Sequence, residues 1–218
     1  MAITDFASLK TAIAARLSRS NMTALIPDFV TIAHAKMLNG DPHPDPRDPK
    51  ADLPALRCTD MLATEVLTLS GGQTTLPADY LEARRFFSDD GNELGISYIP
   101  PERWYTLALT KQAGVPQFYT IEGTTLKVGP IGNYDLNLLY YQRLDVPDAA
   151  ADTNFIFSKA PHAYLYGALA EAYDHIRQPE RSIFYHNQFA SAVRALIEQA
   201  ERAEASGSTL IMRPDAIT

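Results

Sequence analysis

Residues 118–128, FYTIEGTTLKV, decide the structural class of the middle of the chain. The segment contains two short runs typical of β-strands, 118–121 and 124–128, and the pair Glu122-Gly123 lies between them. Two such runs joined by a short glycine-containing connection indicate a β-hairpin. The hairpin therefore predicts that the centre of this 218-residue chain forms sheet rather than helix.

The sequence on both sides of this hairpin also has the pattern of strands and turns. Residues 65–69 alternate before the Gly71-Gly72 turn, and residues 134–141 alternate as a last strand. Between them, Pro100-Pro101 marks the start of a short helix. Together these short strands predict a small antiparallel β domain over residues 59–145.

The two ends of the chain have helical periodicity instead. Near the N-terminus an apolar stripe repeats at steps of three and four, and its members are Ile3, Phe6, Leu9, Ile13 and Leu17. A second helix is expected to start near Pro27 and to end at Gly40. Towards the C-terminus we expect Ser158 to cap a helix over residues 162–176, and a final helix over about 180–205 after Gln178-Pro179.

These patterns predict an α+β protein. Two N-terminal and two C-terminal helices form a bundle over residues 1–58 and 146–206, and the β domain interrupts it. A Pro/Asp-rich loop occupies 41–56, where four prolines between Asp41 and Lys50 oppose both helix and strand. Residues 207–218 are expected to form an extended tail.

The charge of the chain argues against tight binding to nucleic acid. Nineteen basic residues face 26 acidic ones, the net charge is −7, and no basic run exceeds Arg84-Arg85. Proteins that bind DNA tightly neutralise its phosphates with clustered Lys and Arg. We therefore expect no tight DNA binding, and the composition is compatible with an acidic surface past which DNA slides without binding.

Other features limit the compartment and the chemistry. No run of about 18 apolar residues is present, so we expect no membrane partner. The start of the chain, MAITD, lacks the basic and apolar regions of a signal peptide. Cys58 is the single cysteine, which excludes an intramolecular disulfide and suits a reducing compartment.

Candidate chemical sites are few, and each has a simpler interpretation. Glu171 and His175, with Asp174 beside them, have the spacing of metal ligands on a helix, but a solvated face with a Glu–His pair is favoured because no second ligand pair exists. His43, Asp45 and Asp48 fit a solvated loop better than a cation site.

The remaining candidates favour the same conclusion. Asp79 and Glu82 are better explained as caps of a turn than as an acid–base pair, and Cys58 as an idle or buried thiol. Ser158, Ser182 and Ser191 lack the context of a nucleophile. We therefore expect no catalytic residue, no metal and no cofactor.

Tyrosines are concentrated in the last strand and the third helix of the bundle. These tyrosines could stack on nucleic acid, or they could pack in the core and between subunits. They are Tyr140-Tyr141, Tyr164, Tyr166 and Tyr173. Because basic residues do not accompany them, packing is favoured. We expect contacts between subunits at Tyr164, Tyr166, Gly167 and Tyr173.

Several segments together resemble the head-to-tail adaptor, or connector, proteins of tailed bacteriophages. They are LPADYLEAR at 76–84, GVPQFYTIEG at 114–123 and APHAYLYGAL at 160–169, after an opening helix pair at 6–20 and 26–36. Each segment is short, and the resemblance rests on their order and spacing over most of the chain. The Pro/Asp-rich loop departs from the family, which usually passes more directly from the second helix to the first strand.

The resemblance implies a structural, non-enzymatic virion protein at the head–tail junction, assembled in the cytoplasm of the bacterial host. It implies a ring of identical subunits, typically twelve, that binds the portal protein, extends the DNA ejection channel and docks a downstream tail or second connector protein. DNA would pass through without specific binding. Two other classes remain open: a small metal-dependent hydrolase using Glu171 and His175, and a nucleic-acid-binding module using the tyrosines.

The tail provides a further candidate contact. Leu210, Ile211 and Met212 are three consecutive large apolar residues followed by Arg213, and Pro214 prevents a longer central strand. An apolar tail of this kind is best explained by a partner that covers it, so these four residues are expected to contact the portal or a neighbouring subunit. The alternative is a frayed terminus.

Overall fold

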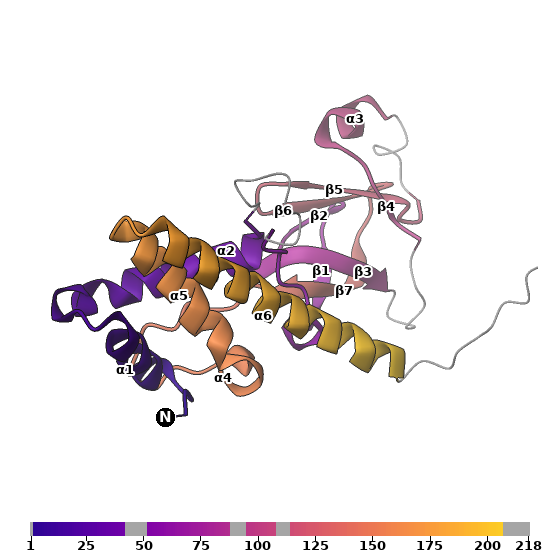
Figure 1. Cartoon of the computed structure of the whole chain (residues 1–218). Coiled ribbons are helices and arrows are strands. Elements are labelled where there is room, and N and C mark those ends of the chain that lie inside the picture. The colour runs from indigo at the N-terminus through magenta and orange to yellow at the C-terminus, as the bar shows by residue number, and fades with distance from the viewer. Residues whose placement is uncertain (1, 42–51, 88–94, 108–113, 207–218) are drawn as a thin grey trace, which may run out of the picture. The chain divides into compact units, whose positions relative to one another are not determined.

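The computed structural model describes residues 2–41, 52–87, 95–107 and 114–206. The chain forms two compact units, one comprising residues up to Asp60 together with those from Asp145 onward, and the other Met61–Leu144. We call them the helical unit and the β unit (Figure 1). The mixture of helices and sheets confirms the predicted α+β class.

The helical unit contains five α-helices, among the residues described. They are α1 (Phe6–Leu17), α2 (Ile26–Asn39), α4 (Phe155–Lys159), α5 (Pro161–His175) and α6 (Pro179–Ser206), and a 3₁₀-helix at Ser20–Leu25 precedes α2. The sequence predicted four helices for this unit, and the difference is the short α4, which ends immediately before α5 begins. None of the helices in the described ranges is both long and apolar enough to span a bilayer.

A capping box and one apolar stripe define α1. The Asp5 carboxylate accepts a hydrogen bond from the Ser8 backbone N–H at 2.8 Å, and Ser8 Oγ accepts one from the Asp5 N–H at 3.1 Å. Ser18, in the left-handed region at φ 51°, ends the helix. Four of the five predicted stripe residues are buried, and the fifth, Ile3, lies before the helix: the buried ones are Phe6, Leu9, Ile13 and Leu17.

Helix α5 packs against both α2 and α6 in the helical unit. Gly167 makes this close approach possible, because a Cβ atom there would lie 2.8 Å from the Ala33 Cβ of α2 and 3.1 Å from the Phe189 ring of α6. Ala163, Ala168 and Ala172 on α5 are also fully buried. The small residues of this helix therefore serve packing within one chain.

A buried polar network joins α2, α4 and α5. His34 and Tyr164 are both almost completely buried, and His34 Nδ1 lies 3.0 Å from the Tyr164 hydroxyl. The Asn154 side chain donates to the same hydroxyl at 2.9 Å and accepts from the Ile156 N–H, so Asn154 is also the N-cap of α4. The prediction that Ser158 caps a helix was wrong, because its hydroxyl donates to the Phe155 carbonyl from within α4.

The two flanks of the Pro/Asp-rich loop are paired with each other. Asp41 and Leu53 exchange two backbone hydrogen bonds at 2.9 and 3.0 Å as an antiparallel bridge. Leu53 and Leu56 are buried, so the end of the predicted 41–56 loop belongs to the core of the unit. Residues 42–51, including His43, Asp45 and Asp48, lie outside the described residues.

In its described residues the β unit contains two sheets and one short helix, α3 (Pro101–Thr106), after a 3₁₀ turn at Thr59–Met61. In the first sheet β7 (Tyr134–Gln142) lies between β1 (Leu62–Leu69) and β3 (Tyr80–Phe87), and all pairs are antiparallel. The second has the order β2 (Gln73–Thr75), β6 (Thr125–Gly129), β5 (Phe118–Glu122) and β4 (Ser97–Tyr98). The predicted hairpin is confirmed as β5–β6.

One strand pair departs from the expected antiparallel arrangement. Strand β4 runs parallel to β5, with Ser97 opposite Phe118. The segment between these strands contains α3, and a parallel pair needs such a long crossover connection. The second sheet is therefore mixed.

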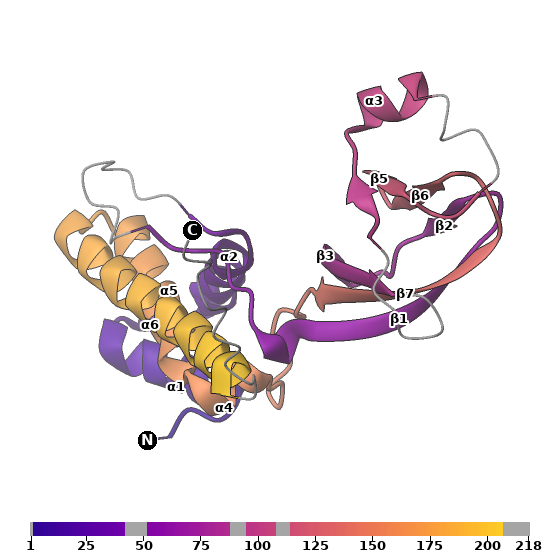
Figure 2. The same cartoon turned by 90° about the vertical axis from the view of Figure 1, so that its right-hand side faces the viewer.

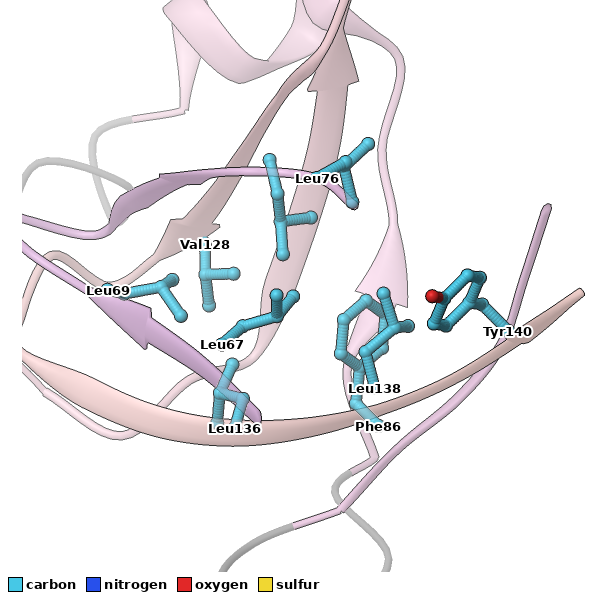
Figure 3. Packing of buried hydrophobic residues seen from close by; sticks show 9 residues of the cluster. Leu67, Leu69, Leu76, Phe86, Val128, Leu136, Leu138 and Tyr140 are labelled. Atoms are coloured by element: carbon cyan, nitrogen blue, oxygen red, sulfur yellow. The ribbon is translucent and has the colours of Figure 1, made fainter. Parts of the chain in front are cut away.

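The core of the β unit lies between the two sheets (Figure 3). Leu67, Leu136 and Leu138 of the first sheet point toward Leu76 and Val128. Leu69, Phe86, Leu126 and Tyr140 complete the buried cluster. Helix α3 lies on the opposite side of the second sheet, away from the first one (Figure 2).

Candidate interaction surfaces

On α5, Glu171, one of the two residues with the spacing of metal ligands, belongs to an ion-pair cluster. The Lys36 ammonium lies 2.9 Å from Glu171 and 3.0 Å from Asp41. Burial disfavours the charge of Lys36, but hydrogen bonds from its ammonium to Glu171 and Asp41 outweigh this and raise its pKa. His175 lies against the Phe29 ring instead, with centroids 5.6 Å apart. Within the described ranges, no three His, Cys, Asp or Glu residues are grouped to hold a metal ion.

The other candidate chemical residues have structural surroundings. Asp79 accepts a hydrogen bond from the Tyr140 hydroxyl at 2.9 Å, and Glu82 lies opposite Tyr141 in the pairing of β3 with β7. Burial, followed by this hydrogen bond, raises the pKa of Tyr140 to about 12. Cys58 is a buried free thiol. These contacts support the fold of the chain and form no arrangement typical of acid–base or nucleophilic catalysis.

The four residues predicted to pack between subunits differ in their accessibility. Tyr164 and Gly167 are buried in the helical unit, and Tyr173 is buried and stacked on Tyr185 with centroids 5.3 Å apart. Tyr166 is half-buried and also lies beside the Tyr185 ring. Of the four, Tyr166 is the one with accessible surface for a neighbour. Leu210, Ile211, Met212 and Arg213 lie outside the described residues.

The start of α6 presents large apolar side chains on the surface of the helical unit. Ile183 is 49% exposed and Phe184 is 56% exposed. Ile183 also lines a cavity of about 190 Å³ beside Lys36, Glu171 and His186. This surface, which we call the α6 start, combines apolar side chains with the ion-pair cluster described above.

The β unit has a second candidate surface, which we call the α3 pocket. It is a cavity of about 250 Å³ between α3 and the neighbouring strands and turns, and its walls include Trp104, Tyr105, Ile131, Val128, Lys127 and Gly72. Gly72 has φ 77°, and a Cβ atom there would lie 2.7 Å from the Val128 carbonyl oxygen. The tight glycine turn therefore forms one wall directly against β6.

Three polar side chains in and beside the α3 pocket are paired with one another. The Lys127 ammonium donates to Glu122 Oε2 at 2.6 Å and to the Tyr105 hydroxyl at 3.0 Å, and Tyr105 donates to Glu122 at 3.0 Å. The hydrogen bond from Lys127 lowers the pKa of Glu122, and the same bond raises the pKa of Lys127. Both groups remain charged and compensate each other at neutral pH.

The sequence did not indicate this pocket. It marked residues 100–104 only as a helix start, although Trp104 is the single tryptophan of the chain. The walls come from the Gly71-Gly72 turn, α3, β6 and Ile131, which are distant in sequence. Only the pairing of β2 with β6 and the position of α3 over the sheet bring them together.

Comparison with known proteins identifies the family. The family model described as SU10 adaptor protein matches residues 4–213, which include both units. A search of curated proteins found no match to the chain. The family match confirms the resemblance to phage head-to-tail adaptors indicated by the sequence segments. The chain therefore belongs to the SU10 adaptor protein family and is a phage adaptor protein.

Proposed function

We propose that this protein forms a ring of identical subunits below the portal of a phage head, extends the DNA channel and docks the next tail component. The match of the adaptor family model over residues 4–213 carries this proposal. Twelve subunits are the expected number for a ring of this type. The role is structural and requires no catalytic residue, and the protein would reside in the virion after assembly in the host cytoplasm.

The charge of the chain supports a channel role. With 26 acidic against 19 basic residues, the chain has a net charge of −7. A negative surface repels the phosphates of passing DNA and avoids the clustered cations that cause tight binding. Such a ring would let DNA pass without holding it.

Exposed apolar side chains supply candidate contacts with neighbours. Ile183 and Phe184 at the α6 start, with Tyr166 on α5, are accessible on the helical unit. A group of exposed apolar residues commonly marks a protein interface. We assign this surface to contacts between subunits, and residues 210–213 to contact with the portal or a neighbouring subunit.

The proposal is tested by mixing the purified protein with the portal protein of the same phage. We expect the protein alone to be monomeric or weakly associated by native mass spectrometry, and to form a ring with rotational symmetry on the portal by electron microscopy. A ring needs head-to-tail contacts. A stable dimer with two-fold symmetry, or no binding to the portal, would contradict the proposal.

A matched pair of variants locates the subunit contact. Phe184→Ser should reduce ring formation on the portal, because it removes an exposed apolar side chain at the α6 start. Val66→Ser, which changes an equally exposed apolar residue on β1, is the control and should assemble normally. Equal assembly of both variants would mean that the α6 start is not part of the contact between subunits.

A further inference from the structure

We propose that the α6 start of one copy of this protein binds the end of α1 in a neighbouring copy, with Arg16 and Arg19 as the residues bound. The inference rests on the subunit contact proposed above for the α6 start, and it identifies the surface on the other side of that contact. The observations that carry it are the charges and apolar side chains of the α6 start and the charge of the segment around α1.

The cavity at the α6 start has an excess of carboxylates. Lys36 lies 3.0 Å from Asp41 and 2.9 Å from Glu171, so one ammonium group serves two carboxylates. Asp174 is a third carboxylate in the cavity wall, and it is exposed. With the residues that the structure describes, the Asp174 carboxylate forms neither a hydrogen bond nor an ion pair. Apart from His186, the titratable side chains of this wall are therefore Lys36 and three carboxylates, which favours a further cation.

Apolar side chains beside this carboxylate favour arginine over lysine as that cation. Ile183 lies in the wall of the same cavity, and the exposed Phe184 follows it on α6. A guanidinium group pairs with a carboxylate and also stacks on an aromatic ring, whereas a lysine ammonium is more strongly hydrated. Arg181 of the same chain lies over the Tyr173 ring, 5.4 Å from its centroid, and is not part of the cavity wall. The α6 start therefore suits a partner that presents arginine.

The segment around α1 presents two arginines of this kind. From Phe6 to Pro27 the sequence has three basic residues and no acidic residue, although the whole chain has a net charge of −7. Arg16 lies in the last turn of α1 and Arg19 follows the helix, and both are exposed. Neither side chain forms a hydrogen bond or an ion pair with the part of the chain that the structure describes. The end of α1 therefore complements the carboxylates at the α6 start.

The two surfaces are different parts of one helical unit, because α1 and α6 are separate helices that each pack on α5 (Figure 1). A contact between two different surfaces of identical subunits is head-to-tail, and contacts of this type generate rings. Association of either surface with its own copy would instead place like charges together, which is unfavourable. The occupant that fits the α6 start is therefore a second copy of this chain.

Cross-linking between free copies tests the contact directly. A carbodiimide joins a carboxylate to an amine without a spacer, so Arg16→Lys and Arg19→Lys are made together to supply amines at unchanged charge. Isotope-labelled and unlabelled copies are mixed at high concentration, and mass spectrometry identifies the links that join different copies. We expect links between Asp174 of one copy and residue 16 or 19 of another.

Two variants in this lysine background locate the contact. Asp174→Asn should reduce the yield of these links at least tenfold, because it removes the carboxylate. Glu180→Gln is the matched control and should change the yield less than twofold, since Glu180 is an exposed carboxylate at the start of α6 that does not line the cavity. Circular dichroism confirms that each variant is folded.

A second experiment reverses the charges and follows assembly on the portal. Arg16→Glu together with Arg19→Glu should reduce the yield of rings at least tenfold, and adding Asp174→Arg should restore part of it. Arg103→Glu together with Arg143→Glu changes the net charge equally at exposed arginines of the β unit and should leave the yield unchanged.

Three outcomes would overturn the inference. One is the absence of links between Asp174 and residues 16 or 19 of different copies, and another is an equal loss of links in Asp174→Asn and Glu180→Gln. The third is linkage of Asp174 to the portal protein in place of these residues when the portal is added, which would make the portal the occupant. The first cross-linking experiment contains no portal protein. Its failure would leave the adaptor role intact, and a failure of the wild-type chain to assemble on the portal would leave the contact between copies intact.

Discussion

The β unit comes from one continuous segment of the chain, whereas the helical unit is assembled from its two ends. In the β unit the predicted hairpin pairs residues that are close in sequence, such as Ile121 with Leu126. In the helical unit α1 is fixed by hydrogen bonds from Phe6 and Ala7 to carbonyls at Asp152 and Ala150. The contacts of the β unit therefore lie within one continuous segment, whereas the helical unit depends on contacts between the two ends of the sequence.

The interiors of the two units also differ in chemistry. The β unit has a core of aliphatic and aromatic side chains, in which the Tyr140 hydroxyl is paired with Asp79. The helical unit buries a His34–Tyr164 pair and relies on Gly167 for close packing. A cavity should therefore lower the stability of the β unit most. Added volume or a lost hydrogen-bond partner should lower the stability of the helical unit.

The largest effect is expected from Leu138→Ala in the β unit. Leu138 is 0% exposed on the central strand β7, and a cavity at such a site costs about 2–5 kcal/mol of the free energy of unfolding. Urea unfolding followed by Trp104 fluorescence should show the loss, while the helical signal at 222 nm shifts less. Val66→Ala, at an exposed site on β1, should change little. Equal shifts of both signals would mean that the two units unfold as one.

Gly167→Val adds volume to the core of the helical unit, whereas Leu138→Ala removes volume from that of the β unit. Added atoms would collide with Ala33 and Phe189, and overpacking of this kind typically costs about 1–3 kcal/mol. The 222 nm transition should move to lower temperature, and the Trp104 transition should stay in place. Gly95→Ala is the control, since a Cβ there meets no atom within 4 Å. A stable Gly167→Val protein would argue against the packing of α5 described here.

A smaller loss is expected from Tyr164→Phe. The variant keeps the ring but leaves the buried His34 Nδ1 and the Asn154 amide without the hydroxyl, at a cost of about 1–2 kcal/mol. Thermal unfolding at 222 nm measures it. Tyr166→Phe, at a half-buried site on the same helix, should cost less than half as much. Similar losses of stability in both variants would mean that the buried network of His34, Tyr164 and Asn154 does not stabilise the helical unit.

Alkaline pH should weaken the β unit through Tyr140. Its pKa is about 12 in the folded chain against an ordinary value of 10.0, so the unfolded chain releases this proton first. The stabilisation is complete below pH 10 and decreases between pH 10 and 12, by about 1 kcal/mol per pH unit. Urea unfolding monitored by Trp104 across this range should show the decline. Tyr140→Phe should make the decline less steep but not abolish it, because burial also raises the pKa values of Tyr80 and Tyr119 in the same unit. An unchanged slope in that variant would assign the decline to other groups.

The smallest effect is expected in the Pro/Asp-rich loop. Deleting residues 44–49 shortens a connection whose ends are already joined by the Asp41–Leu53 bridge. Loop length contributes only weakly to closure entropy, so the free energy of unfolding should change by less than about 1 kcal/mol. Calorimetry of the deletion variant measures it. A fall of many degrees in Tm would show that the loop packs on the helical unit.

Features set by neighbouring residues could be predicted from the sequence, and features set by distant contacts could not. The α1 stripe and the β5–β6 hairpin depend on periodicity and a short turn, and both were predicted. Asn154 was missed as a cap because Ser158 has equal local propensity, and only the contact of Asn154 with Tyr164 distinguishes it. The parallel β4–β5 pair and the α3 pocket depend on how α3 crosses the second sheet, which no local pattern encodes.

The register of β1 with β7 has a consequence for the order of folding. Leu62 lies opposite Tyr141, so the first and last strands of the β unit place its two ends about 5 Å apart. Once this unit has folded, its residues no longer lengthen the connection between the N-terminal and the C-terminal helices, and that connection is effectively much shorter. Closing a short loop costs less entropy, and non-local contacts then form faster. We therefore expect folding of the β unit to bring the N-terminal and C-terminal helices together. Variants that slow the collapse of the β unit should then also delay the pairing of these helices, although no helical residue is changed.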